Sequence, residues 1–127
     1  MSRTGEFTGK KCLLVEDNEL NVLVISKMLE IVKFSWHSEP NGLLGVEAFE
    51  KGEYDLVIMD LHMPVMDGME ASSILIKKYP GIPIIMLSAN VTKEALNQAM
   101  DIGIEHYITK PVSKEKLVQT INKALKK

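Results

Sequence analysis

The stretch "DLVIMDLHMPVMDGME", residues 55–70, joins a run of apolar residues directly to an acid. Leu56 to Met59 indicate a buried strand, because a short continuous apolar run is typical of a strand covered on both faces of a sheet. Asp60 follows at once, although a core strand has no use for a carboxylate at its tip. The acid therefore indicates either that the chain turns into solvent here or that Asp60 has a chemical role.

Short apolar runs alternate with helical patterns on both sides of this stretch. The runs lie at 12–15, 34–36, 56–59, 84–87 and 106–108, and "SEPNG", 38–42, is predicted to be a turn. Helices are predicted from about 20 to 31, up to 50, from about 68 to 78, from about 92 to 101, and at the end of the chain. Five such units predict an α/β fold, a flavodoxin-like doubly wound (βα)5 domain whose five parallel strands have the order 2-1-3-4-5 and helices on both faces.

Length and composition indicate one domain. The chain has 127 residues, 46% of them hydrophobic, which is enough for one core. Residues 1–10 have no periodicity and are predicted to be a flexible leader or linker, and residues 11–127 to form the domain. Cys12 lies in an apolar run and is predicted to be a buried thiol, as suits a reducing compartment.

The charge and hydropathy patterns exclude several classes of partner. Fifteen basic residues against 17 acidic ones give a formal net charge of −2 and no broad basic field, so we expect no direct binding to nucleic acid. No segment approaches the roughly 20 consecutive apolar residues of a membrane span, and the first residues lack a signal-peptide pattern. We therefore expect a cytoplasmic protein without membrane insertion.

Polar or charged side chains follow four of the five predicted strands. Because the carboxyl ends of parallel strands meet at one edge of the sheet, and strands one and three are neighbours in this order, these side chains are expected to converge. Taken alone, each of them is more often a turn, cap or solvated loop residue. The set consists of Glu16, Asp17, Asp60, Ser88 and Lys110.

Together these residue types predict a phosphoryl site. Carboxylates that lie close together repel one another unless their pKa values rise or a cation binds, and a hard divalent ion such as Mg²⁺ meets that need. Mn²⁺ is the alternative ion. Lys110 adds a compact positive charge suited to a phosphate oxygen, and Ser88 adds a hydroxyl donor.

Four motifs in this order resemble the receiver domain of two-component response regulators. They are "LLVEDNELN" at 13–21, "DLVIMDLHMPVMDG" at 55–68, "IIMLSA" at 84–89 and "YITKP" at 107–111. The resemblance covers residues 11–127. The sequences of the first two motifs look most like those of receivers carried by hybrid sensor histidine kinases.

The resemblance implies a role for each residue of the predicted phosphoryl site. Asp60 would be the phosphoacceptor, which attacks the phosphorus of a phosphohistidine. Asp17 and Asp60 would bind Mg²⁺ through their carboxylates, His62 through its main-chain carbonyl, and Glu16 through a water. Lys110 would bind the phosphoryl group, and the Lys110-Pro111 peptide is expected to be cis.

Further residues receive roles only through the resemblance. Leu61 and Ala89 would help Lys110 to bind the phosphoryl group. Ser88 and Tyr107 look like the family's switch pair, in which Ser88 moves toward the phosphoryl oxygens and Tyr107 turns inward. His62 and Asn90 stand at positions that tune how fast water attacks the phosphoaspartate, and an exposed loop residue is the simpler interpretation of His62.

Asp67 and the methionines near it have structural interpretations. Asp67 is predicted to cap the third helix and not to bind metal. Met59, Met63 and Met66 are predicted to fill gaps around the loop after Asp60.

The implied function is that of a signalling switch rather than a classical enzyme, catalysing only its own phosphoryl transfer and slow dephosphorylation. Its partners would be a histidine kinase or histidine phosphotransfer protein, and then a downstream protein or a domain of the parent chain. An FMN carrier is disfavoured by the acids after the first strand, a nucleotide site by the lack of a Gly-rich fingerprint, and an aspartyl phosphatase by the lack of a cap domain. A receiver-like protein-binding module without phosphorylation remains the alternative.

Overall fold

Strands and helices alternate strictly along the chain. The computed structural model describes residues 7–89 and 92–125. The strands are β1 (Lys11–Val15), β2 (Ser35–Glu39), β3 (Leu56–Asp60), β4 (Ile84–Ser88) and β5 (His106–Thr109). The helices are α1 (Glu19–Ile31), α2 (Gly42–Lys51), α3 (Gly68–Lys78), α4 (Lys93–Ile102) and α5 (Lys114–Leu125).

The five strands form one parallel sheet in the order β2-β1-β3-β4-β5, which confirms the predicted fold class. Val15 is paired with Met59, and Asp60 with Leu87. The ends of β1, β3 and β4 therefore lie side by side at the carboxyl edge of the sheet, where the residues that follow them can meet.

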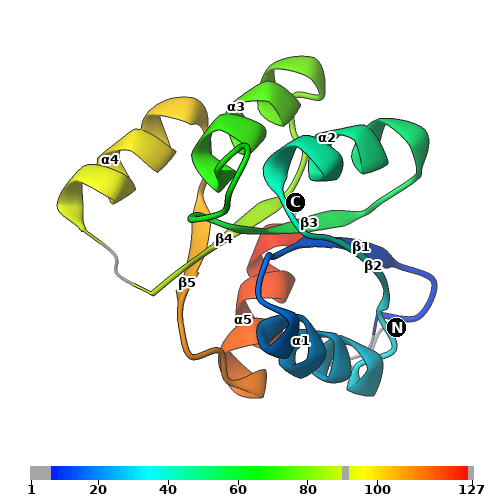
Figure 1. The fold of residues 1–127 in the computed structure, drawn as a ribbon. Coiled ribbons are helices and arrows are strands. Elements are labelled where there is room, and N and C mark those ends of the chain that lie inside the picture. The colour runs from blue at the N-terminus through cyan, green and yellow to red at the C-terminus, as the bar shows by residue number, and fades with distance from the viewer. Residues whose placement is uncertain (1–6, 90–91, 126–127) are drawn as a thin grey trace.

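Two helical layers cover the sheet (Figure 1). Cys12 and Leu14 of β1 belong to the core cluster that includes residues of α1 and α5, whereas Leu13 and Val15 belong to the cluster that includes residues of α2 and α3. This alternation follows from the two-residue period of a strand. It explains why strands buried on both faces read as continuous apolar runs.

Side-chain caps start all five described helices. The side-chain oxygens of Asn18, Asn41, Asp67, Thr92 and Ser113 each accept a hydrogen bond from the amide three residues further on, at 2.9–3.1 Å. Such caps satisfy amides that have no partner inside the helix. The predicted role of Asp67 as a helix cap is confirmed.

The second strand differs from its prediction. The structure places Phe34 before β2 and buries it, and β2 continues through Ser38 and Glu39 into the predicted turn. Ser38 and Glu39 pair with Leu14 and Val15. An edge strand pairs through its backbone and can carry polar side chains, which is why the hydropathy pattern ended it too early.

The end of the predicted leader is packed against the domain. Residues 1–6 lie outside the described residues, but the amide of Phe7 donates to the carbonyl of Val32 at 2.7 Å. The ring of Phe7 lies 5.3 Å from that of Phe34, centroid to centroid. From Phe7 onward the segment is therefore held against the core, and the exact domain boundary stays a prediction.

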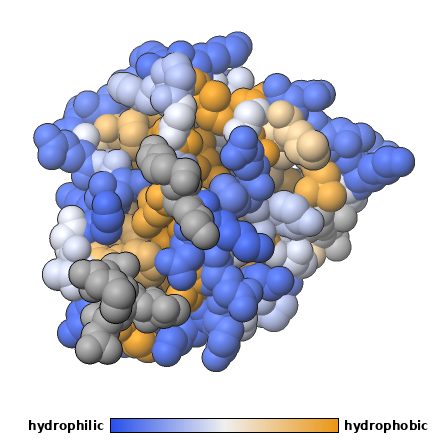
Figure 2. Space-filling view, turned by 180° about the vertical axis from the view of Figure 1, so that it is seen from behind, coloured by the Kyte–Doolittle hydropathy of each residue, from blue (hydrophilic) through white to orange (hydrophobic). Residues whose placement is uncertain are grey.

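One face of the molecule is mostly polar. On the face that Figure 2 shows, hydrophilic residues cover most of the surface and hydrophobic residues show in the gaps between them. Among the residues that the structure describes, none of the helices combines the length and the apolar character needed to cross a membrane.

The thiol of Cys12 should be inert in the folded protein. Its side chain is fully buried, as predicted, and burial raises its pKa well above the ordinary value of a thiol. Because a thiolate is the reactive species, modification by Ellman's reagent requires the β1 region to open. We expect labelling to be at least about 1,000-fold slower in buffer than in urea. Labelling at similar rates would contradict this core position.

Gly68 should be required for the close approach of α3 to the end of β3. Its amide donates to the carbonyl of Leu61 at 2.9 Å, and a Cβ on Gly68 would overlap the carbonyl oxygen of Asp60. Relieving that overlap requires backbone movement, so Gly68→Ala should lower the free energy of unfolding by about 1–3 kcal/mol in urea titrations. Ser73→Ala, in the same helix, should change it by less than about 0.5 kcal/mol. Equal stability of Gly68→Ala and the wild type would contradict the packing described.

Candidate phosphoryl-transfer site

Three acids meet at the carboxyl edge of the sheet, as predicted. Glu16 and Asp17 follow β1, and Asp60 is the last residue of β3. One carboxylate oxygen from each lies within 4.8 Å of the others. Glu16 is 2% exposed and Asp60 3%, whereas Asp17 is exposed to solvent. The site is thus a buried pair of acids with a third at its mouth.

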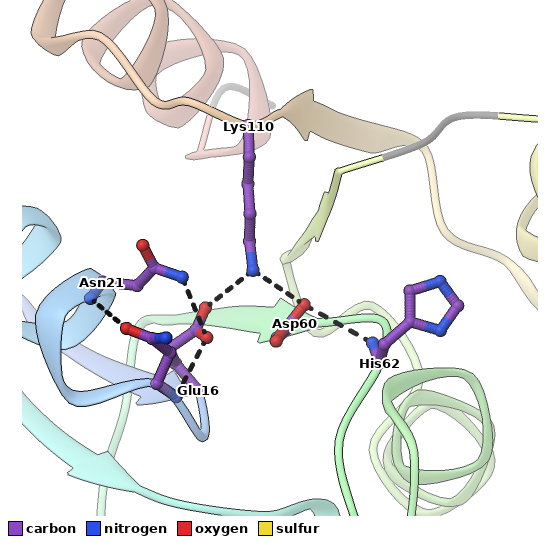
Figure 3. A network of polar contacts seen from close by, with 6 residues as sticks. Glu16, Asn21, Asp60, His62 and Lys110 are labelled. Atoms are coloured by element: carbon purple, nitrogen blue, oxygen red, sulfur yellow. Dashed lines mark hydrogen bonds and ion pairs between the residues drawn. The ribbon is translucent and has the colours of Figure 1, made fainter.

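Lys110 bridges the two buried acids. Its Nζ lies 3.2 Å from Oδ1 of Asp60 and 3.3 Å from Oε1 of Glu16 (Figure 3). The amide of Lys110 donates to the carbonyl of Ser88 at 2.8 Å, which fixes the residue beside the end of β4. The Lys110-Pro111 peptide is cis, as expected. The predicted convergence of Lys110 with the acids is therefore confirmed.

Glu16 is held by the start of α1. Its Oε2 accepts hydrogen bonds from the amide of Asn18 at 3.2 Å and from the side-chain amide of Asn21 at 3.4 Å. Burial raises the pKa of Glu16 above its ordinary value, and the nearby Asp60 raises it further, while Lys110 opposes both. A second cation would relieve the same repulsion.

The loop after Asp60 supplies one main-chain amide to the site. The amide of His62 donates to Oδ1 of Asp60 at 3.4 Å, and Figure 3 shows the imidazole extending away from the carboxylate. Leu61 was expected to bind a phosphoryl group, but its amide donates to the carbonyl of Leu87 at 2.9 Å and its side chain is buried. The sheet ladder thus uses the amide of Leu61, and a phosphoryl contact by Leu61 stays a prediction.

The remaining predicted residues lie around the ends of β4 and β5. Ser88 is 4% exposed at the end of β4, and Ala89, just beyond it, is exposed. Tyr107 lies on β5 opposite Met86 and is 48% exposed. Asn90 lies outside the described residues.

Ser88 and Tyr107 border the same cavity. An apolar cavity of about 500 Å³ lies between α4 and the strands β4 and β5. Both residues line it, together with Leu61, Ala99 and Ile104. Space is therefore present beside Ser88 into which the half-exposed ring of Tyr107 could turn.

Sequence reasoning missed two groups of the site. Asn21 contacts Glu16, and the His62 amide faces Asp60. The spacing of Asn18 and Asn21 was a usable signal for the first, because Asn18 caps α1 and the first turn then lies beside the site. No sequence signal marks the His62 amide, because its availability depends on which main-chain amides form hydrogen bonds within the sheet.

The acid cluster fits a hard divalent cation. The side chains of Glu16, Asp17 and Asp60 offer only oxygen donors, and the buried Oε1 of Glu16 forms an ion pair with Lys110 at 3.3 Å but accepts no hydrogen bond among the described residues. Mg²⁺ prefers carboxylate oxygens and retains several waters, for which the exposed mouth at Asp17 leaves room. The chemistry of these donors suits Mg²⁺ better than a metal that prefers sulfur or nitrogen.

A family model described as response regulator receiver domain matches residues 12–122. Hybrid signal transduction histidine kinase G of Dictyostelium discoideum is 40% identical over 121 residues, which cover 89% of this chain and 3% of that protein. The chain thus spans a small part of this relative.

Two solved receiver domains share the fold, one with a bound magnesium ion and one in complex with a phosphotransfer protein. The receiver domain of sensor histidine kinase PA1611 from Pseudomonas aeruginosa, with a magnesium ion coordinated in its active site cleft, is 29% identical, has a TM-score of 0.85 and covers 93% of this chain and 98% of its own. The receiver domain of Ssk1, solved with the histidine phosphotransfer protein Ypd1 of Saccharomyces cerevisiae, is 29% identical, with a TM-score of 0.81 and coverage of 91% and 88%. The chain therefore belongs to the response regulator receiver domains of two-component and phosphorelay signalling.

Proposed function

We propose that Asp60 accepts a phosphoryl group from a phosphohistidine of a histidine kinase or histidine phosphotransfer protein. One observation carries the proposal: the buried carboxylate of Asp60 ends a central strand, with the Nζ of Lys110 3.2 Å away and two further acids within 4.8 Å. A rigid strand end holds a nucleophile in place, and positioning with charge stabilisation provides most of the catalysis of phosphoryl transfer.

The proposed transfer forms one bond and breaks another. A carboxylate oxygen of Asp60 bonds to phosphorus while the P–N bond of the phosphohistidine breaks. The electron pair of that bond stays on the imidazole nitrogen, which then takes up a proton. Lys110, the hydroxyl of Ser88 and the amide of His62 are proposed to stabilise the charge on the phosphoryl oxygens, and the contacts of Lys110 and His62 with Asp60 support this. Ala89 is proposed as a further contact.

Mg²⁺, or Mn²⁺ in its place, is proposed as the cofactor. Asp17 and Asp60 would bind it through carboxylates, the main-chain carbonyl of His62 would add a ligand, and Glu16 would act through a water. When bound, the ion offsets the negative charge that the phosphoryl group brings to the acids. The magnesium ion in the PA1611 receiver supports this proposal.

The conformational output is proposed to pass through Ser88 and Tyr107. A phosphoryl group on Asp60 adds about −1.5 to −2 charges, which would draw the hydroxyl of Ser88 toward it. Tyr107 would then turn into the cavity that both residues line. His62 and Asn90 are proposed to tune the slow, self-catalysed loss of the phosphoryl group, so that the domain acts as a timed switch rather than as an enzyme with turnover.

The proposed partners follow from the same reaction. The donor is a histidine kinase or a histidine phosphotransfer protein, as the complex of Ypd1 with the Ssk1 receiver supports. The acceptor of the signal is a downstream protein or another domain of a parent chain. We propose a cytoplasmic location, because phosphohistidine donors are made from ATP, and no direct contact with nucleic acid.

Replacing Asp60 tests the proposal. With acetyl phosphate and Mg²⁺, the wild type should gain one labile phosphoryl group by intact-mass spectrometry, and chelation of the metal should prevent the gain. Asp60→Asn should abolish it, because an amide is not a nucleophile toward phosphorus. Asp67→Asn is the matched control and should be labelled within about twofold of the wild type, since Asn also caps a helix well.

Two outcomes would reject the proposed chemistry. Labelling of Asp60→Asn to the wild-type level would place the acceptor elsewhere. A wild type labelled neither by acetyl phosphate nor by a phosphorylated histidine protein would favour the alternative of a binding module without phosphorylation.

A further inference from the structure

The first turn of α1 carries an asparagine that the proposed reaction does not use. The side-chain amide of Asn21 donates to Oε2 of Glu16 at 3.4 Å, and its main-chain amide donates to the capping side chain of Asn18 at 3.0 Å. The cap thus fixes the main chain of Asn21 beside the site of the acids. In Figure 3 the side-chain nitrogen of Asn21 points to Glu16 and its oxygen points away.

Glu16 depends on this donor because the residue is almost inaccessible to water. It is 2% exposed, and its Oε2 also accepts the amide of Asn18 at 3.2 Å. Its Oε1 accepts no hydrogen bond among the described residues and is paired with Lys110. Water cannot easily replace a donor lost from a buried carboxylate, which is then poorly solvated. The amide of Asn21 therefore offsets part of the charge that Glu16 presents to its neighbours.

Lys110 divides its charge between two carboxylates. Its Nζ lies 3.3 Å from Oε1 of Glu16 and 3.2 Å from Oδ1 of Asp60. Because the two distances are nearly equal, neither acid holds the ammonium group alone. Charges interact strongly where water is excluded, so a change in the charge that Glu16 presents shifts the position of Lys110. A donor on Oε2 weakens the pull of Glu16 on Lys110, and the loss of that donor strengthens it.

Asparagine suits this position because it offers a donor without a net charge. An aspartate would add a fourth carboxylate to the cluster, and a lysine or arginine would bring a second permanent cation to the acids. An apolar side chain would leave Oε2 of Glu16 with the amide of Asn18 alone. The second asparagine of "VEDNELN", residues 15–21, thus has a chemical use besides helix formation.

We propose that Asn21 is a positioning residue for phosphoryl transfer: by donating to Glu16, it keeps Lys110 shared with Asp60 and available to the phosphoryl oxygens. The inference rests on the proposed function. Asn21 acts through Glu16 and Lys110 and not on the reacting atoms. Without its amide, Lys110 stays closer to Glu16, so the transfer slows. Metal binding changes little, because Glu16 gains charge compensation from Lys110 as it loses Asn21.

The test separates the transfer from metal binding. Wild type, Asn21→Ala and Asn21→Asp are labelled with acetyl phosphate at saturating Mg²⁺, and the rate is followed by intact-mass spectrometry. Binding of Mn²⁺ without a phosphoryl donor is measured by electron paramagnetic resonance of the free ion. Asn21→Ala should be labelled at least about threefold more slowly, with a Kd for Mn²⁺ within about twofold of the wild type.

The charged variant and a matched control sharpen the comparison. Asn21→Asp should be labelled more slowly than Asn21→Ala and bind Mn²⁺ more tightly, because its carboxylate attracts both Lys110 and the ion. Asn122→Ala replaces an exposed asparagine of α5 and should match the wild type in both measurements. Asn21→Ala should melt within about 3 °C of the wild type, since alanine keeps the main-chain amide and favours a helix.

A double-mutant cycle tests the route through Glu16. Glu16→Gln keeps the shape of the side chain but removes the charge that competes for Lys110. In that background, Asn21→Ala should change the labelling rate by less than about 1.5-fold. The same fold loss as in the wild-type background would overturn the route.

Three further results would overturn the role of Asn21. They are equal labelling rates of wild type and Asn21→Ala, a loss seen only below saturating Mg²⁺, and faster labelling of Asn21→Asp than of Asn21→Ala. The second would place Asn21 in metal binding instead. A wild type labelled neither by acetyl phosphate nor by a phosphorylated histidine protein would reject the proposed function itself, and this inference with it.

Discussion

The contact of Lys110 with Asp60 and Glu16 is the constraint on which the rest of the site depends. Two carboxylates that are each nearly inaccessible to water cannot remain charged side by side without a positive partner, and Lys110 supplies one at 3.2 and 3.3 Å. The three residues come from the ends of β1, β3 and β5, so their attraction ties together segments far apart in the chain. Three carboxylates against one ammonium group leave the site with an excess of negative charge that favours a further cation, and Lys110 provides a positive charge suited to a phosphoryl group.

The parallel sheet determines where this chemistry can take place. Strands buried on both faces bring their carboxyl ends to one edge, and capped helices begin directly beyond it. Gly68 lets α3 approach the end of β3 closely, so that the start of α3 packs against the main chain of Asp60. The rigid sheet thus positions the nucleophile, and the start of α1 holds Glu16 beside it.

The sequence predicted the fold and the acids because both leave strong local patterns. Continuous apolar runs indicate parallel strands, and an acid directly after such a run, as at Asp60, stands out from the core around it. The contact of the His62 amide with Asp60 was not predictable, because it depends on which amides the ladder between β3 and β4 uses. The packing of Phe7 likewise depends on tertiary contacts, which no residue pattern marked.

Chemical trapping of the phosphorylated residue tests the central claim most directly. The protein is phosphorylated with acetyl phosphate and Mg²⁺ and reduced with borohydride, which converts an aspartyl phosphate to homoserine, and the digested peptides are sequenced by mass spectrometry. Our account predicts homoserine at residue 60 and at no other position. Reduction at residue 16 or 17, with Asp60 unchanged, would contradict the account.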